Sequence, residues 1–353
     1  GNVGNYVASP LSVLVLLSAL LTSKGPKGKT AKELCQAIVG KREKETCSDL
    51  KYPNIERKLD RIRTGVANSK TEDGKKILSL SNAVFLRKGL HVYPGFLERF
   101  TGFGEDHVKQ VLFNTSEAFE KINEWSRSST DGLIEQFLKS KDELSSDTLM
   151  VLLSAIAFKA YSISNLDNWA KTFMVENTVK RDFYLKKGAS VKVPMMHLET
   201  QMVYLKQDRF KVIAKPFRVR LFINNYRYKF VIFLPNERFN LKEIENDLED
   251  GNFNWRLIQS DRNYTHIELA LPKFKAEHEI NLKSVLRLLG VRRISSHPRL
   301  SVGEAKQVAV MEILPMSLPP PSVPFIVDQP FYCAIYDSFL QMPLFIARIA
   351  DPR

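Results

Sequence analysis

The segment that decides the fold lies near the start of the chain and reads NYVASPLSVLVLLSALLTSKGPKG (residues 5–28). Ser9 and Pro10 precede a run of apolar residues, and a serine cap followed by proline at the first helical position is a typical helix start. Gly25-Pro26 ends the run. The segment therefore predicts a helix that begins at Pro10, and its apolar stretch is too short to cross a bilayer.

The composition is that of an ordinary soluble domain. The chain has 353 residues, of which 44% are hydrophobic and 26% charged. It contains no low-complexity linker and no fixed-period repeat, so we expect residues 1–353 to form a single domain. Helical patterns dominate the first third and strand patterns the remainder, which predicts an α+β fold.

Individual elements can be predicted from the period of the apolar residues. From Ile55 they recur at helical spacing, which predicts an amphipathic surface helix. Thr30 is expected to cap an earlier helix, with Glu33 at capping-box spacing. Residues 78–86, 151–159 and 229–234 are predicted to be strands. Residues 325–349 are also strand-like, with a break at Asp337-Ser338.

No active-site or metal-binding pattern is visible in the sequence. The six histidines are scattered singly, and we find no G-x-S-x-G turn, phosphate-binding glycine loop or C-x-x-C pair. We therefore expect no enzyme activity, no metal and no resident cofactor. The net charge of +13 favours acidic partners, but without a nucleic-acid-binding motif we predict no nucleic-acid partner.

Eleven short motifs, spread over nearly the whole chain, resemble those of serpins and occur in the order and spacing of that family. They are NYVASPLS (5–12), GKTAKEL (28–34), SNAVF (81–85), INEW (122–125), AIAFK (155–159), VPMM (193–196), FLP (233–235), LPKF (271–274), LLGV (288–291), DQPF (328–331) and PLFIAR (343–348). Each motif alone is weak evidence of relationship. Because all eleven occur in family order, the whole chain resembles a serpin.

The resemblance implies a serpin fold with three β-sheets and about nine helices, held in a metastable native form. In that family an exposed reactive loop is cleaved by a target protease and inserts as a new central strand of the large sheet, which traps the protease covalently. The implied function is inhibition of a serine protease as a suicide substrate, and the protein itself is not an enzyme.

The carboxy-terminal region departs from the family. Residues 304–313 look like the strand that leads into the reactive loop, and LPMSLPPP (314–321) looks like the far end of that loop, with no hinge between them. A strand that crosses a sheet of about 50 Å needs roughly 15 residues. Either about 15 residues are missing from the printed chain between Ile313 and Leu314, which we favour, or the protein lacks an insertable loop. The family's first helix also has no counterpart before Ser9.

The segment around Met316 resembles the reactive centre of α1-antitrypsin, which belongs to this family. The resemblance makes Met316 the P1 residue and Ser317 the P1′ residue of the reactive bond. An unbranched, uncharged methionine suits the apolar primary pocket of elastase-like or chymotrypsin-like proteases. The alternative is that the two motifs align by chance and that P1 lies among the missing residues.

Two further sets of residues correspond to family sites. The shutter beneath the large sheet is matched by Ser9 and Ser12, with Ser154 in place of the usual asparagine and Gln329 in place of a usual histidine. The basic residues of the helix from Ile55 fall where heparin-binding serpins often have their site for heparin or another glycosaminoglycan. The alternative interpretation is that this helix has an ordinary solvent-exposed charged face with no specific ligand, because it also carries Glu56 and Asp60. The candidate glycosaminoglycan-binding residues are Arg57, Lys58, Arg61 and Arg63.

The cellular setting can be inferred only in outline. Asn114 and Asn263 are candidate N-glycosylation acceptors, and we expect a secreted or surface-exposed monomer with no membrane span, the alternative being an intracellular serpin. The cysteines leave two alternatives open: either Cys35 and Cys47 form a disulfide, or all three cysteines, including Cys333, stay reduced. The rival to the inhibitor is a non-inhibitory serpin that acts as a carrier, chaperone or glycosaminoglycan-binding module.

Overall fold

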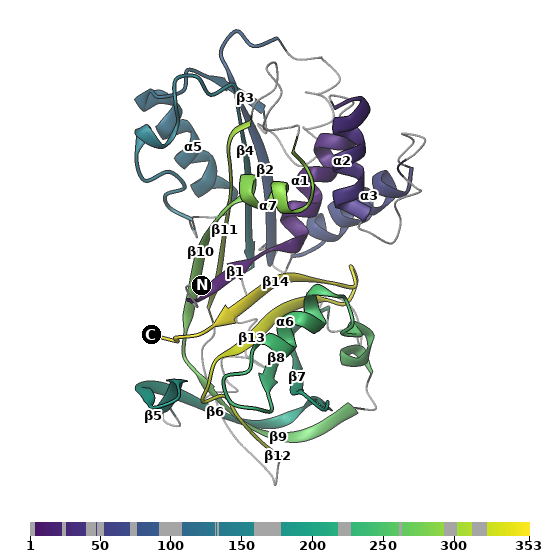
Figure 1. Ribbon diagram of the computed structural model, residues 1–353, viewed down its shortest axis with the longest axis vertical. Helices are drawn as coiled ribbons and strands as arrows, with labels where there is room; N and C mark the ends of the chain where they lie inside the picture. Colours follow the sequence, from purple (N-terminus) through teal and green to yellow (C-terminus); the bar gives the residue numbers. More distant parts are fainter. Residues whose placement is uncertain are drawn as a thin grey trace.

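Two β-sheets follow one another along the long axis of the molecule, and most of the helices surround the sheet drawn at the top of Figure 1. The computed structural model describes residues 4–22, 26–39, 47, 53–70, 76–91, 108–130, 132, 134–158, 178–217, 227–260, 263–292, 302–312 and 323–353. Within these residues it has six α-helices. They are α1 (Pro10–Thr22), α2 (Gly28–Val39), α3 (Pro53–Ala67), α5 (Ser116–Ser129), α6 (Lys242–Glu249) and α7 (Leu282–Leu288).

The upper sheet has five strands within the described residues, in the order β10-β11-β4-β2-β3. All nine residues of its central strand β4 are buried, because helices cover both faces. Leu152 and Ile156 pack in clusters with α1, whereas Leu153 and Ala155 pack against Trp125 of α5 on the opposite face. The strands are β2 (Leu78–Arg87), β3 (Val108–Val111), β4 (Met150–Phe158), β10 (Lys275–Asn281) and β11 (Val302–Glu312).

The lower sheet has nine strands within the described part of the chain, in the order β1-β14-β13-β8-β7-β6-β9-β12, with β5 paired to β6. The eighteen-residue strand β6 pairs with β5 and β9 over most of its length and with β7 only at its end, from Val203 to Lys206. The strands are β1 (Tyr6–Ala8), β5 (Val179–Lys186), β6 (Ala189–Lys206), β7 (Phe210–Pro216), β8 (Tyr228–Pro235), β9 (Tyr264–Pro272), β12 (Val323–Ile326), β13 (Phe331–Asp337) and β14 (Met342–Ile349).

The structure shows the expected α+β arrangement, with one difference from the expected three sheets. Two sheets that would be separate in a three-sheet description are joined here, because β6 passes from one into the other and keeps a hydrogen-bonded neighbour in each. The predicted strands at 78–86, 151–159 and 229–234 are confirmed. The cap at Thr30 is wrong, because α2 already begins at Gly28.

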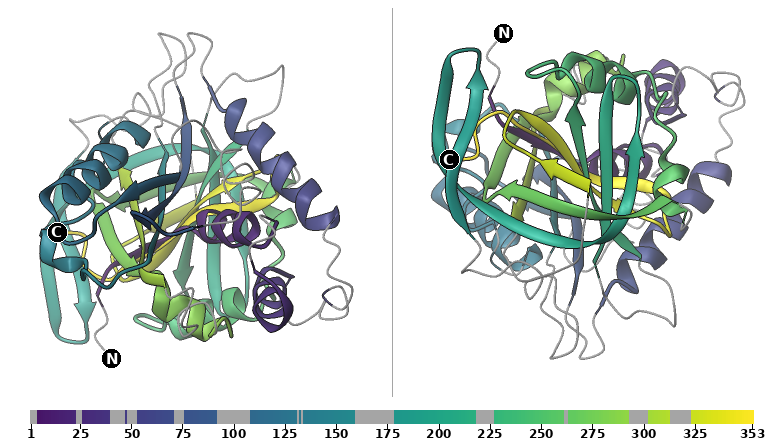
Figure 2. Two further views of the ribbon diagram at one scale, coloured as in Figure 1. Left: turned by 90° about the horizontal axis from the view of Figure 1, so that it is seen from above. Right: turned by 90° about the horizontal axis from the view of Figure 1, so that it is seen from below.

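Helix α1 is the core of the molecule and lies between the two sheets (Figure 1). Ten of its thirteen residues are buried, seven of them apolar, as expected for an internal helix. Seen along the long axis, α3 and α5 lie on opposite sides of the molecule, with α1 between them (Figure 2). The predicted helix from Ile55 is therefore a surface helix, and its buried face consists of Ile55, Leu59 and Ile62.

A buried ion pair connects α3 to the nine-stranded sheet. The guanidinium of Arg227 donates to both carboxylate oxygens of Asp337 at 2.7–3.1 Å, and its Nη1 donates to the carbonyl of Gly65 in α3 at 2.8 Å. Asp337 also accepts from the backbone N–H groups of Phe339 and Leu340. The side chains of Arg227 and Asp337 are only 9% and 0% exposed, so both charges are hydrogen-bonded and shielded from solvent.

Replacing Asp337 with asparagine should lower the free energy of unfolding by about 3–5 kcal/mol, because it leaves the buried Arg227 charge without a partner. Urea denaturation of the variant measures this loss. The control is Asp182→Asn, which removes an exposed pair with Lys192 and should cost about 0–1 kcal/mol. Equal losses for the two variants would show that the Arg227–Asp337 pair is not a structural anchor.

Candidate functional site

Strands β4 and β11 are direct parallel neighbours at the centre of the five-stranded sheet. Their register runs from Val302 opposite Met150 to Val310 opposite Ala157, with one irregularity near Glu304. On its other side β11 pairs antiparallel with β10. No strand therefore lies between β4 and β11, and an additional strand between them would have to separate this parallel pair.

Three polar residues lie at the same level of three adjacent strands. Ser154 of β4 is opposite Asn82 of β2 on one side and Gln307 of β11 on the other. Residues that are opposite each other in a sheet share a face, and Ser154 lies on the same face of β4 as Leu152 and Ile156, which pack toward α1. Ser154 was predicted from the sequence, whereas Asn82 and Gln307 were missed because strand register is not visible in a single sequence.

The hydroxyl of Ser154 is enclosed and lacks a hydrogen-bond partner among the described residues. Ser154 is 0% exposed, and its Oγ has no partner within the described part of the chain. A buried hydroxyl without a partner costs free energy, because it loses its bonds to water on folding. The centre of the sheet therefore has a polar position that is not fully satisfied.

Ser9 and Ser12 lie together at the start of α1. The Oγ of Ser9 accepts from the backbone N–H of Ser12 at 3.2 Å, and the Oγ of Ser12 donates to the carbonyl of Ser9 at 3.4 Å. Both residues are 0% exposed. The structure thus places these two predicted shutter residues side by side, at the end of the helix that packs against the Ser154 face of the sheet.

The structure does not bring Gln329 to these serines. Its side-chain amide donates to the carbonyl of Pro235 at 3.1 Å and accepts from the backbone N–H of Phe239 at 3.0 Å. Ala8, next to Ser9, lies at the level of Ala334 in the β1-β14-β13 stack, five residues along the chain from Gln329. At about 3.3 Å per residue this is a separation of roughly 15 Å. Gln329 therefore holds the turn after β8.

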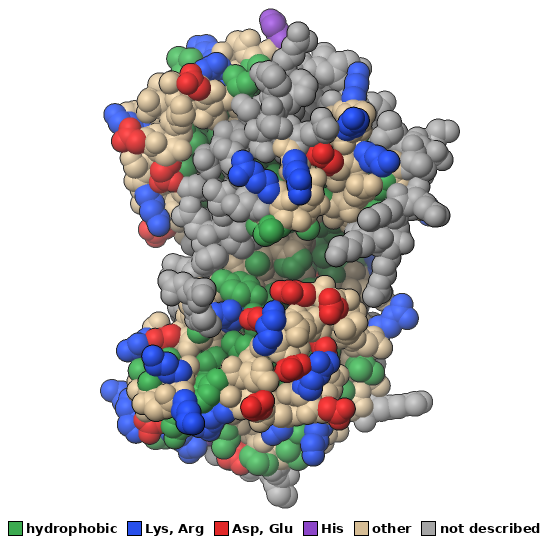
Figure 3. Space-filling model, viewed as in Figure 1, with side chains coloured by type: hydrophobic (Ala, Val, Ile, Leu, Met, Phe, Trp, Pro, Cys, Tyr) green, Lys and Arg blue, Asp and Glu red, His purple; other side chains and the backbone are tan. Residues whose placement is uncertain are grey.

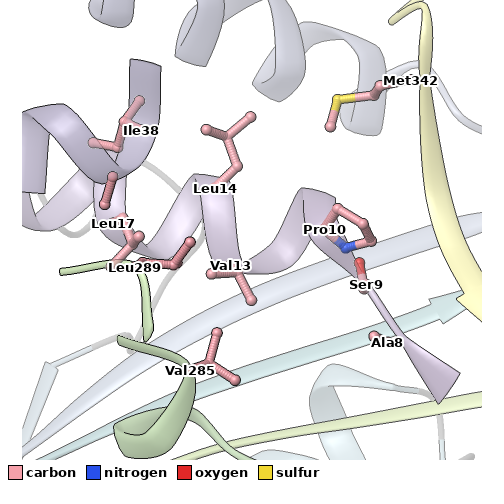
Figure 4. Close-up of a pocket in the computed structure, with 11 residues that line it drawn as sticks. Ala8, Ser9, Pro10, Val13, Leu14, Leu17, Ile38, Val285, Leu289 and Met342 are labelled. Carbon is pink, nitrogen blue, oxygen red and sulfur yellow. The ribbon is translucent and has the colours of Figure 1, made fainter. Parts of the chain in front are cut away.

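An apolar hollow of about 420 Å³ adjoins Ser9 and Pro10. In Figure 4 the side chains of Val13, Leu14 and Leu17 project from α1 toward this space, and Val285 and Leu289 approach it from the segment of α7. Apolar side chains are also visible in the hollow between the two halves of the molecule (Figure 3). The hollow has few polar groups among its described lining residues and so offers no catalytic chemistry.

The basic face of α3 is partly occupied by contacts within the protein. Arg61 stacks 5.1 Å from the ring centre of Phe339 and donates to its carbonyl. Arg63 forms an ion pair with Asp60 at 3.0 Å, and Arg57 donates to the side chain of Asn54 at 2.5 Å. Arg57, Lys58 and Arg61 are exposed on the same surface, as predicted. Three of the four predicted residues of this surface, Arg57, Arg61 and Arg63, therefore have partners on α3 or on the loop of Phe339.

Met316 and Ser317, the predicted reactive bond, lie outside the described residues. Strand β11 ends at Glu312 and β12 begins at Val323. The connection between them therefore consists of residues 313–322. Its length is known from the sequence, and it leads from the five-stranded sheet to an edge of the nine-stranded sheet.

A family model described as "Serpin (serine protease inhibitor)" matches residues 2–352. The chain belongs to the serpin family. "Serpin A12" of Mus musculus is 28% identical over 378 residues, covering 99% of this chain and 83% of that protein, and "Alpha-1-antitrypsin 1-2" of Mus musculus is 25% identical with 99% and 84% covered. The structure of a serpin from Schistosoma mansoni aligns with a TM-score of 0.82 at 25% identity, covering 99% and 96% of the two chains.

This serpin has one disulfide within its described residues, between Cys35 of α2 and Cys47. Both partners are buried, at 0% and 1% exposure. Cys333 is a free cysteine in the core, and burial raises the pKa of its thiol well above the ordinary value. Of the two alternatives left open by the sequence, a Cys35–Cys47 bond or three reduced cysteines, the structure therefore has the bond.

The two candidate glycosylation sites of the serpin differ in access. Asn114 is exposed in a turn before α5, with a φ of 59°. Asn263 is half-buried, and its Nδ2 donates to the carbonyl of Leu257 at 3.1 Å. Since a glycan is attached to this same nitrogen, Asn114 is the more accessible acceptor.

Within the described residues we find no group of three or more potential metal-ligating side chains. Among the helices of the described part, none is long and apolar enough to span a membrane.

Replacing Ser154 with alanine should raise the free energy of unfolding by about 1 kcal/mol, because it removes a buried hydroxyl that has no partner. Urea denaturation measures the change. The matched control is Ser69→Ala, since the buried Ser69 Oγ accepts from Leu78 N–H at 3.0 Å and from the Tyr228 hydroxyl at 2.6 Å, and its loss should cost about 1–2 kcal/mol. A destabilised Ser154→Ala variant would contradict this description of the shutter.

Proposed function

We propose that this serpin inhibits a serine protease of apolar P1 preference and that the Met316–Ser317 bond is its bait. The proposal is carried by the family membership together with the LPMSLPP segment at residues 314–320. A relative named "Antichymotrypsin-2" from Bombyx mori is 29% identical over 326 residues, and that name agrees with an apolar primary pocket. Methionine fills such a pocket without a charge to desolvate.

Inhibition by insertion depends on the contact between β4 and β11. A strand that entered there would run antiparallel to both, because it follows β11 directly and must turn back. Such a strand would pair along the stretch from Met150 to Ala157 that β11 now occupies. After cleavage at Met316 the printed chain offers only Ile313 to Met316 for this purpose, and Pro315 has no backbone N–H to donate. The inhibitory proposal therefore requires roughly 15 further residues between Ile313 and Leu314.

The second candidate is a non-inhibitory serpin that acts as a carrier, chaperone or glycosaminoglycan-binding module. The short connection of residues 313–322 in the printed sequence favours it, because this segment cannot cross the sheet. A protease that cuts Met316–Ser317 in such a protein releases two chains and leaves with its activity intact. The two candidates thus differ in whether a covalent complex survives.

Mass measurement and protease challenge separate the two candidates. For the inhibitor we expect the peptide map to show roughly 15 additional residues between Ile313 and Leu314, and an SDS-stable complex with elastase or chymotrypsin. Trypsin serves as the control protease and should form little complex. A mass that matches the printed chain, with Ile313 bonded directly to Leu314 in the peptide map, would refute the inhibitor proposal.

Mild oxidation should test Met316 as the bait residue. Conversion of its thioether to the sulfoxide makes the side chain polar, so we expect the association rate with elastase to fall about tenfold or more. A Met316→Leu variant should keep its rate and resist the oxidant. If the variant loses rate on oxidation as the unmodified protein does, another methionine carries the effect.

The remaining expectations are proposals about setting and cofactor. We propose a secreted monomer, supported by the Cys35–Cys47 disulfide, which is typical of oxidising compartments, and by the exposed Asn114. We further propose that heparin or a related glycosaminoglycan contacts the exposed basic face of α3, formed by Arg57, Lys58 and Arg61.

A further inference from the structure

A second cavity, of about 520 Å³, lies between the later part of α3, the first residues of β2 and the end of α5. Its volume is within the range of about 300–1,000 Å³ that is usual for small-molecule sites. It is distinct from the β4–β11 contact and from the hollow beside Ser9. Lys70 and Lys76, from the described ends of the connection between α3 and β2, are among its lining residues.

Two lysines face each other at this mouth. Lys70 and Lys76 are opposite partners of an isolated antiparallel β-bridge, both line the cavity and both are exposed. Like charges directly opposite each other across such a bridge repel. In the part of the chain that the structure describes, neither lysine forms an ion pair. The backbone bridge therefore sets the two side chains opposite each other, and no described carboxylate is paired with either of them.

Ser69 holds the two lysines in this arrangement. Its carbonyl accepts from Ile77 N–H at 2.8 Å, and its buried Oγ accepts from Leu78 N–H at 3.0 Å and from the Tyr228 hydroxyl at 2.6 Å. These bonds fasten the residues on either side of the lysines to each other and to the nine-stranded sheet. The lysine pair is thus a fixed feature of the fold.

Behind the lysines the cavity is mixed in character. Leu78 and Leu80 are buried parts of the core, and Val66 packs against the same cluster. Ser79 and Ser81 are half-buried and add hydroxyl groups to the wall. An occupant that satisfies every part of this surface carries negative charge at one end and an apolar body at the other.

We propose that this cavity binds an amphipathic organic anion, such as a long-chain carboxylate. The anionic group lies between Lys70 and Lys76, where it relieves their repulsion, and the apolar body covers Val66 and the neighbouring leucines. Charge-assisted bonds to two ammonium groups are stronger than bonds between neutral groups. The intervening residues 71–75 lie outside the described part of the chain and include Glu72 and Asp73.

The test uses the fluorescent anion 8-anilinonaphthalene-1-sulfonate and its uncharged analogue N-phenyl-1-naphthylamine. We expect the sulfonate to bind saturably with a stoichiometry of one and the neutral analogue to bind at least about tenfold more weakly. Oleate should displace the sulfonate, whereas equal concentrations of acetate and inorganic phosphate should not. Displacement by phosphate or acetate alone would show a simple anion site and overturn the amphipathic proposal.

Variants locate the probe. Lys70→Gln with Lys76→Gln should weaken sulfonate binding by about tenfold or more without lowering the urea midpoint, because the change removes a repulsion. Lys180→Gln with Lys186→Gln, at exposed positions of β5, changes the net charge equally and should leave binding unaltered. Ser81→Trp fills the cavity without altering its charge and should also abolish binding of the sulfonate. The double variant Glu72→Gln with Asp73→Asn removes two negative charges and should bind the sulfonate at least as tightly as the wild type.

Three results would overturn the proposal. They are no saturable binding by the wild type, equal affinity for the neutral analogue, and equal weakening by the two lysine double variants. Far-UV circular dichroism of each variant distinguishes loss of the cavity from loss of the fold, since naphthalene probes also bind partly unfolded chains.

Discussion

The parallel contact between β4 and β11 is the constraint on which the rest of the structure depends. Parallel neighbours need a crossover connection, and here it extends from residue 159 to residue 301, so that strands β5 to β10 all lie within it. The crossover therefore contains much of the nine-stranded sheet. An antiparallel strand placed between β4 and β11 would replace one parallel ladder with two antiparallel ones, which are slightly more stable per residue. The arrangement is consistent with the metastable native form expected of a serpin.

The Arg227–Asp337 pair and the Ser154 hydroxyl are both buried, but they differ in how many hydrogen bonds they make. Arg227 and Asp337 share several hydrogen bonds and connect α3 to the nine-stranded sheet. Ser154, at the centre of the five-stranded sheet, has a hydroxyl with no partner in the described residues. A satisfied pair resists separation, because breaking it leaves an isolated buried charge, whereas an unsatisfied hydroxyl gains bonds when the surrounding structure opens. The Arg227–Asp337 pair thus lies between α3 and the nine-stranded sheet, where it resists separation. Ser154 lies in the strand β4, beside which an inserting strand would have to open the five-stranded sheet.

The length of the connection between β11 and β12 separates the two functional candidates. Both use the same fold, the same bait segment and the same buried sheet, and only the number of residues after Ile313 differs. A strand cannot span a distance that exceeds about 3.3–3.6 Å per residue, so no local change of conformation can compensate for a missing hinge. The cavity beside Lys70 and Lys76 is independent of this question, because none of its described walls belongs to that connection.

The sequence by itself determined the family, the α+β class and most of the element positions, because motif order and apolar period are properties of the chain. It also located Ser9, Ser12, Ser154 and the basic face of α3. Only the tertiary structure placed Asn82 and Gln307 beside Ser154, moved Gln329 to the turn after β8, and assigned Arg61 to Phe339. The physical reason is that strand register and the choice of partner depend on residues far apart in the chain. The opposition of Lys70 and Lys76 likewise depends on bonds from Ile77 and Leu78 to Ser69, which also accepts from Tyr228, 159 residues away.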